Sequence, residues 1–432
     1  MDSYRVEKDS LGKKNIPNDA YYGVQTLRAL ENFPISGIMS DRVFVESYLQ
    51  IKKAAALANL KCKALDIKIS EPIVSACEEL LSGKCADQFV VDVFQAGAGT
   101  SFNMNVNEVV ANYALELMGE GKGKYFIINP NDHVNMSQST NDTYPTAMRI
   151  AAMQKLKMLL PSLASLQNVL EEKSNEFADV IKSGRTHLQD ATPIRLGQEF
   201  SGYASVLKKH TAAISDSKKY LLELGLGGTA VGTGINTPKN YRDAVIKELN
   251  NITSIGFRKA ENYFESMQSM FPFVHLSNTL TNLSLDLIRI SNDLRLLGSG
   301  PRTGLAEIKL PAVQPGSSIM PGKVNPSIAE MVNMVCFQVV GNNTTVSLAA
   351  QAGQLELNVM MPIINFNLLQ SIEILTNAIS VFSEKFVKGI EANRKRCKEF
   401  AEQSVSIATF LNIKIGYLKT AELVKEALEK NI

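Results

Sequence analysis

The clearest pattern in the sequence is a seam of apolar residues between positions 273 and 297. Its members are alternately three and four residues apart: Phe273, Leu276, Leu280, Leu283, Leu287, Ile290, Leu294 and Leu297. A spacing that averages 3.5 residues places these side chains on one face of a helix that packs against other helices. The pattern therefore predicts a long helix in a coiled coil or helical bundle.

Four further stretches have helical periodicity: 143–178, 195–224, 327–380 and 387–411. In the first of them we expect a kink at Pro161 and an apolar face made by Leu156, Leu160, Leu163, Leu166 and Leu170. Helices longer than ~25 residues exceed the range that is common in globular proteins. One chain would not cover several long apolar faces by itself, so we predict an all-α, mainly helical fold whose central bundle is shared between subunits.

Short segments rich in glycine, serine, threonine and asparagine separate the predicted helices. They are 95–107, 129–142, 183–193, 225–238 and 298–326. Loops on a rigid scaffold carry a disproportionate share of catalytic groups. We divide the chain into an N-terminal domain, 1–141, a central helical bundle domain, 142–389, and a short C-terminal domain, 390–432.

Composition excludes several classes of function. The 432 residues carry 45 Lys and Arg against 43 Asp and Glu, a net charge of +2, so no global field attracts nucleic acid or an anionic membrane. The sequence lacks a signal-like start and any apolar run of about 18 residues. Its five cysteines form no C-x-x-C pair, which favours reduced thiols and a cytoplasmic protein. No metal-ligand or nucleotide-binding spacing occurs, so we expect no cofactor.

The segment 316–326, Gly-Ser-Ser-Ile-Met-Pro-Gly-Lys-Val-Asn-Pro, gathers the most chemistry. It brings together two hydroxyls, Ser317 and Ser318, with the ammonium of Lys323 and the amide of Asn325. A point charge beside an amide donor suits a carboxylate. The glycines let the backbone approach a ligand closely and the prolines limit its motion. A merely mobile surface loop is the alternative interpretation.

Three other segments offer hydroxyl, amide or imidazole groups with little formal charge. Their candidate residues are Thr100, Ser139, Thr140, Asn141, Thr186 and His187. Ser139 and Thr140 precede a predicted long helix, whose free backbone N–H groups and positive end favour an anion. Beside a loop that carries a lysine, these segments predict a pocket for a small dicarboxylic acid.

The segment 316–326 resembles the signature loop of the aspartase–fumarase superfamily. The resemblance continues through 99–101, 139–142 and 184–190 and extends from about Arg5 to Gly416. It implies a homotetramer with a shared central bundle, in which each active site is built from three subunits. A non-catalytic helical scaffold is the alternative from another class, but such a scaffold would have no use for the hydroxyls and the lysine together.

Within the superfamily, the segments 20–26, 95–99 and 115–125, and Thr140, are similar to aspartate ammonia-lyases. The segment 227–234 is more similar to class II fumarases, which hydrate fumarate to L-malate, and this remains the alternative enzyme. Met361 departs from the aspartase pattern, which usually has glutamate at that position.

The resemblance also implies a mechanism, the reversible deamination of L-aspartate to fumarate and ammonia. Proton removal beside a carboxylate builds charge on that carboxylate as an aci-anion, which positioned donors stabilise. Ser317 would be the general base. Lys323 and Asn325 would hold the α-carboxylate. The β-carboxylate would contact Ser318, Thr100, Ser139 and Thr140, and the amino group would contact Asn141, Thr186 and the catalytic His187.

Overall fold

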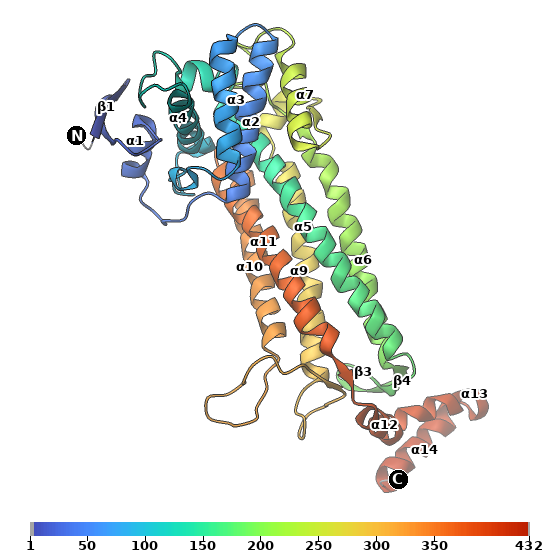
Figure 1. Ribbon diagram of the computed structural model, residues 1–432. Coiled ribbons are helices and arrows are strands. Elements are labelled where there is room, and N and C mark those ends of the chain that lie inside the picture. Colours follow the sequence, from blue (N-terminus) through green and yellow to red (C-terminus); the bar gives the residue numbers. More distant parts are fainter. Residues whose placement is uncertain (1–3, 431–432) are drawn as a thin grey trace. The chain divides into compact units, whose positions relative to one another are not determined.

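The computed structural model describes residues 4–430 and confirms a mainly helical fold (Figure 1). Packing divides the chain into two compact units, which we describe separately. The first comprises residues 4–157, 215–280 and 340–373, and the second 158–214, 281–339 and 374–430. The boundaries cut through long helices rather than the segments between them, so the three-domain division made from the sequence stays a prediction.

The helix bounds are α1 (Val24–Asn32), α2 (Arg42–Lys61), α3 (Ile67–Leu81), α4 (Thr100–Leu117), α5 (Thr140–Glu176), α6 (Leu196–Leu221), α7 (Tyr241–Thr253), α8 (Tyr263–Gln268), α9 (Phe271–Leu297), α10 (Ser327–Gln351), α11 (Met361–Lys385), α12 (Arg394–Gln403), α13 (Asn412–Ile415) and α14 (Tyr417–Lys430). Short helical turns are η1 (Ala86–Gln88), η2 (Gly97–Gly99), η3 (Pro130–Val134), η4 (Val387–Gly389) and η5 (Val405–Leu411). None of the helices within 4–430 is long and apolar enough to cross a membrane.

The strands are short and pair two by two: β1 (Tyr4–Asp9) with β2 (Gly12–Pro17), β3 (Ile181–Thr186) with β4 (Gln189–Arg195), β5 (Glu223–Leu224) with β6 (Arg258–Lys259), and β7 (Ile308–Lys309) with β8 (Glu391–Ala392). All pairs are antiparallel except β5 with β6. The strands therefore tie loops together and do not form a core sheet.

The apolar seam predicted for 273–297 is the buried face of α9. All eight of its residues are at most 7% exposed. Ser277, Ser284 and Ser291, seven residues apart, are buried beside them. Small side chains at this repeat allow neighbouring helices to approach closely. Because all eight residues of the seam are buried, the heptad spacing predicted the packing face of α9 correctly.

The helix predicted from 143 begins three residues earlier, as α5 at Thr140, and continues through Pro161. Its buried leucines are Leu156, Leu159, Leu163, Leu166 and Leu170. The prediction of Leu160 at this face was wrong, because the 3-4-3-4 spacing of the buried residues requires Leu159 instead.

The single helix predicted for 327–380 is two helices, α10 and α11. Asn358, between them, donates to the carbonyls of Ala349 and Ala350 at 3.1 and 2.9 Å, and its Oδ1 accepts from Met360 N at 2.8 Å. One side chain thus satisfies the last turn of α10 and the start of α11. Met361, the departure from the aspartase pattern, is fully buried at the first position of α11.

The helix predicted for 387–411 is also interrupted. Asn393 caps α12 by accepting from Arg396 N, and Ser404 caps η5 by accepting from Ser406 N. Asparagine and serine favour such caps over helix interiors because their side chains compete for backbone hydrogen bonds. Periodicity alone did not reveal these stops.

Candidate active site

The N-terminus of α5 carries three of the predicted site residues. Ser139 is its N-cap: Ser139 Oγ accepts from Asn141 N at 3.2 Å, and Ser139 N donates to Asp142 Oδ1 at 3.0 Å. This reciprocal pair has the form of a capping box with aspartate at the third helical position. It fixes the orientation of the first turn, and the positive end of the helix favours an anion there.

The glycine-rich segment 225–234 packs against this first turn. Asp142 Oδ2 accepts from Gly227 N at 3.0 Å and from Thr229 N at 2.9 Å. The amide of Asn141 donates to Ala230 O at 2.8 Å. Asp142 is fully buried, and burial raises the pKa of its carboxyl to about 7. The segment thus forms part of the structure around the predicted site.

Thr100 begins α4, so the predicted loop 95–107 is wrong in its second half, which is helical. The preceding Gly99 has a φ of 83°, in the left-handed region that favours glycine. A Cβ atom at Gly99 would lie 2.0 Å from the Tyr144 ring. Only glycine therefore lets α4 begin this close to α5.

The two helix N-termini meet at one cavity of about 550 Å³ in the first unit. Four predicted residues line it: Thr100, Ser139, Thr140 and Asn141. The other lining residues are Gln25, Asn103, Met104, Asn131, Asn135, Ser137, Gln138, Thr229, Ala230, Val231, Thr233, Ile235 and Asn236. None of these side chains carries a formal charge. Hydroxyls, amides and the positive ends of two helices make this a site suited to a carboxylate.

Sequence reasoning missed the amides of Asn103, Asn135 and Gln138. All three accept hydrogen bonds from Lys52, a fully buried lysine of α2. The available signal was an unusual frequency of asparagine in a helix: α4 also contains Asn105, Asn107 and Asn112, and all are buried. Buried asparagines need partners, and here they indicate a polar network.

Thr186 and His187 lie in the second unit, at the tip of the hairpin β3–β4. The sequence predicted a loop for 183–193, and that prediction was wrong because these residues pair as strands. His187 and Leu188 have φ values of 55° and 59°, as a two-residue type I′ turn requires. The turn leaves Thr186 and His187 exposed.

Ser317, Ser318, Lys323 and Asn325 also lie in the second unit, on the loop before α10. Gly316 N donates to Lys323 O at 2.8 Å, and Asn325 Nδ2 donates to Gly316 O at 2.6 Å. A Cβ atom at Gly316 would lie 2.6 Å from both Lys323 O and Asn325 N. These bonds close the loop at its base, with Ser317 half-buried and both Ser318 and Lys323 exposed.

Two backbone N–H groups point at the hydroxyl oxygen of Ser317. Ser317 Oγ accepts from Ile319 N at 3.2 Å and from Met320 N at 2.9 Å. Hydrogen bonds donated to an oxygen favour its negatively charged form. The loop therefore holds Ser317 in a setting that suits a proton acceptor.

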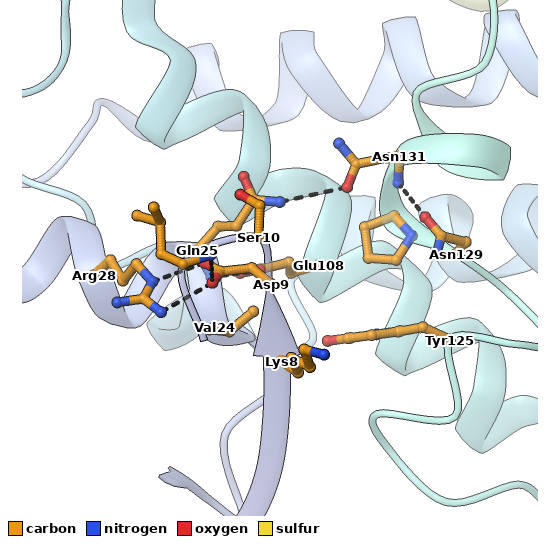
Figure 2. Close-up of a pocket in the computed structure, with 12 residues that line it drawn as sticks. Lys8, Asp9, Ser10, Val24, Gln25, Arg28, Glu108, Tyr125, Asn129 and Asn131 are labelled. Atoms are coloured by element: carbon orange, nitrogen blue, oxygen red, sulfur yellow. Dashed lines mark hydrogen bonds and ion pairs between the residues drawn. The ribbon is translucent and has the colours of Figure 1, made fainter. Parts of the chain in front are cut away.

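A second cavity of about 420 Å³ in the first unit has more charged groups (Figure 2). Asp9, Arg28 and Glu108 are already engaged, and Lys8 is exposed. Arg28 donates to both oxygens of Asp9, at 2.7 and 2.9 Å, and Glu108 accepts from Gly23 N, Gln25 N and Thr26 N. Gln25 and Asn131 touch at 3.4 Å and line both cavities. We take the less charged cavity as the candidate site, because it lies where α4 and α5 begin and is lined by four of the predicted site residues.

The model of the lyase family matches residues 12–341 of the chain. The chain belongs to this family. Curated relatives of this lyase include aspartate ammonia-lyase from Bacillus subtilis, which is 51% identical over 98% of the chain and 90% of the relative. Aspartate ammonia-lyase from Helicobacter pylori is 49% identical over 99% of the chain and 92% of the relative.

Solved structures similar to this lyase include a fumarate lyase:delta crystallin and a class II fumarase. A fumarate lyase:delta crystallin from Brucella melitensis, bound to cobalt, superposes with a TM-score of 0.96 at 50% identity, covering 99% of the chain and 94% of that structure. A class II fumarase from Schistosoma mansoni superposes with a TM-score of 0.97 at 42% identity, covering 99% of the chain and 93% of that structure. The fold is therefore that of the superfamily, and the chemistry depends on the site.

Proposed function

We propose that this lyase deaminates L-aspartate reversibly to fumarate and ammonia. The observation that carries the proposal is the cavity where α4 and α5 begin, which is lined by hydroxyls and amides without a formal charge. Such a site binds a carboxylate through helix N-termini and hydroxyl donors. The curated relatives at about half identity over nearly the whole chain support aspartate as the substrate.

In the proposed reaction Ser317 removes the proton beside the β-carboxylate. Ile319 N and Met320 N stabilise negative charge on its oxygen. An ordinary serine is a weak base, so this local stabilisation is needed for the role. The electron pair left by that proton then forms the carbon–carbon double bond as the C–N bond breaks, and the protonated amino group departs as ammonia, assisted by His187 with Asn141 and Thr186.

The developing charge on the β-carboxylate is spread over fixed donors. Thr100, Ser139, Thr140 and Ser318 supply hydroxyls to it, and each well-placed donor contributes about 3 kcal/mol to the transition state. Lys323 and Asn325 bind the α-carboxylate. One N–H of the Asn325 amide bonds Gly316 O, so the second N–H is the one offered to the substrate.

The active enzyme is proposed to be a cytoplasmic homotetramer whose active sites combine residues of three subunits. The ten proposed site residues lie on separate segments of two compact units, and assembly of copies would bring such segments together. Exposed apolar side chains on the long helices support assembly: Met158, Met334 and Phe337 are 66, 67 and 60% exposed. Met334 and Phe337 lie three residues apart on one face of α10, and contiguous exposed apolar side chains mark protein–protein contacts.

Hydration of fumarate is the alternative reaction. The similarity to the Schistosoma mansoni class II fumarase favours it, because the two reactions share a pocket for two carboxylates. The two are separated by supplying fumarate with and without ammonia and following its ultraviolet absorbance. Deamination chemistry predicts loss of absorbance only with ammonia. Loss without ammonia would indicate a hydratase, and no loss in either case would contradict both.

A further inference from the structure

Lys52, on α2, is fully buried behind the wall of the candidate site. Its ammonium lies 2.8 Å from Asn103 Oδ1, 3.0 Å from Asn135 Oδ1 and 3.0 Å from Gln138 Oε1. All three amides line the cavity. One layer of side chains therefore separates this ammonium from whatever occupies the cavity.

The contacts of Lys52 match a charged side chain. An ammonium has three N–H donors and no acceptor, and here three amide oxygens take all three donors. A neutral amine has only two N–H donors, so its lone pair would face the third of these oxygens. Among residues 4–430 no carboxylate oxygen lies within 4.0 Å of this ammonium. A buried charge without a counter-charge is unfavourable, so an anion in the cavity would stabilise it.

Three titratable groups face Lys52 from the packed elements: Tyr48 on α2, Cys77 on α3 and Asp142 on α5. Burial holds the pKa of Tyr48 well above its usual value and raises the pKa of Cys77 to about 12, so both stay neutral. Burial lowers the pKa of Lys52 to about 7, against the opposing effect of Asp142. Asp142 carries three backbone hydrogen bonds, which offset part of its own charge.

We propose that Lys52 is a positioning residue that supplies the positive charge of this cavity and attracts a dianionic ligand without touching it. The ammonium also turns the oxygens of three lining amides toward itself. Amide oxygens facing the cavity would repel a carboxylate. The proposal rests on the proposed function in one respect, that the ligand is a small dicarboxylate.

Charge linkage gives the proposal a measurable consequence. A dianion in the cavity favours the charged form of Lys52 and so raises the pKa of its ammonium. Above pH 7 part of the free protein has lost that proton, so binding must take a proton up. Affinity for the dianion should therefore fall as pH rises above about 7. Ionisation of Asp142 acts in the same direction, so variants of Lys52 are needed to assign the effect.

The test uses succinate, a dicarboxylate without a leaving group, and titration calorimetry of the full chain. At pH 7.5, two buffers of different ionisation enthalpy report the number of protons taken up. The wild type should take up about half a proton or more. Lys52→Gln should bind succinate at least tenfold more weakly, and the proton taken up should be lost. Lys53→Gln is the matched control, because Lys53 is half-buried and paired with Glu78 at 2.7 Å.

A structural role alone would weaken binding equally at every pH and leave proton uptake unchanged. The proposal would be overturned if a folded Lys52→Gln chain bound succinate with the same affinity and the same proton uptake as the wild type. If that variant does not fold, the wild type decides: binding of succinate without proton uptake between pH 7 and 8.5 overturns it. If the wild-type chain shows no proton uptake but still deaminates L-aspartate in a parallel assay, only the assignment of Lys52 has failed. Absence of both turnover and binding would contradict the proposed function as well.

Discussion

Arg185 Nη1 donates to Glu307 Oε1 at 2.8 Å, and this pair joins the strand that ends at Thr186 to the segment that leads to the Ser317 loop. Lys182 Nζ lies 2.8 Å from the second oxygen of Glu307. The side chain of Glu307 is completely buried. The backbone carbonyl of Glu307 also accepts from Asn393 N at 2.9 Å. One residue thus connects the hairpin, the loop segment and the start of α12.

Glu307→Gln should therefore destabilise the protein markedly. The substitution leaves Lys182 and Arg185 without their shared carboxylate, and breaking a buried pair costs roughly 3–5 kcal/mol. Urea unfolding measures the change. Glu391→Gln is the control, because Glu391 forms an exposed pair with Lys309 at 3.2 Å and should change stability by less than about 1 kcal/mol. Equal changes in the free energy of unfolding from the two substitutions would contradict the role of Glu307 in connecting the hairpin, the loop segment and α12.

Ser317→Ala should lower turnover of L-aspartate by roughly a thousandfold or more, because it removes the proposed base. Binding of succinate should survive, since the carboxylate contacts remain. Steady-state kinetics and titration calorimetry on the same preparation check both expectations. Near-normal turnover would exclude Ser317 as the base.

Gly99→Ala should destabilise the first unit and impair binding. The new Cβ would lie 2.0 Å from the Tyr144 ring, and the φ of 83° disfavours alanine. Gly202→Ala is the matched control. Gly202 is exposed within α6, and a Cβ atom added there would have no other atom within 4 Å. Alanine there should stabilise by about 0.5–1 kcal/mol. Thermal melts compare the two, and a stable Gly99→Ala chain would contradict the described approach of α4 to α5.

Chelation should leave a substantial rate at neutral pH, because the proposed chemistry uses a hydroxyl base and hydrogen-bond donors. Dialysis against a chelator followed by an L-aspartate assay tests this. Complete loss of activity, with recovery only on addition of a divalent ion, would contradict the proposed mechanism, because the reaction would then require a metal ion.

The helical part of the fold was predictable where local spacing decides packing. The heptad seam of α9 is an example, since burial of all eight residues follows from their 3-4 spacing. Leu159 and Leu160 are adjacent leucines, and the same regular 3-4 spacing, applied strictly, selects Leu159 as the buried one. The break at Asn358 was missed because its caps depend on how its side chain is oriented.

The sequence placed four of the predicted site residues correctly beside one another, and the roles of all ten stay predictions. Thr100, Ser139, Thr140 and Asn141 do line one cavity, whereas a site that unites all ten residues stays a prediction. Lys52 gave no signal, because Lys52-Lys53 has the appearance of an ordinary pair on a helix surface. Only the packing of α2 shows that the first is buried and the second is half-buried.

The most direct test of the central claim is a comparison of kcat/KM for deamination of L-aspartate and dehydration of L-malate by the same preparation. Both substrates offer the same two carboxylates, so the ratio reports how the site recognises and expels the leaving group. Groups that hydrogen-bond a specific leaving group can discriminate by ~10⁴-fold or more. We predict that L-aspartate is preferred by orders of magnitude. A preference for L-malate would contradict the proposed function and leave only membership of the lyase family.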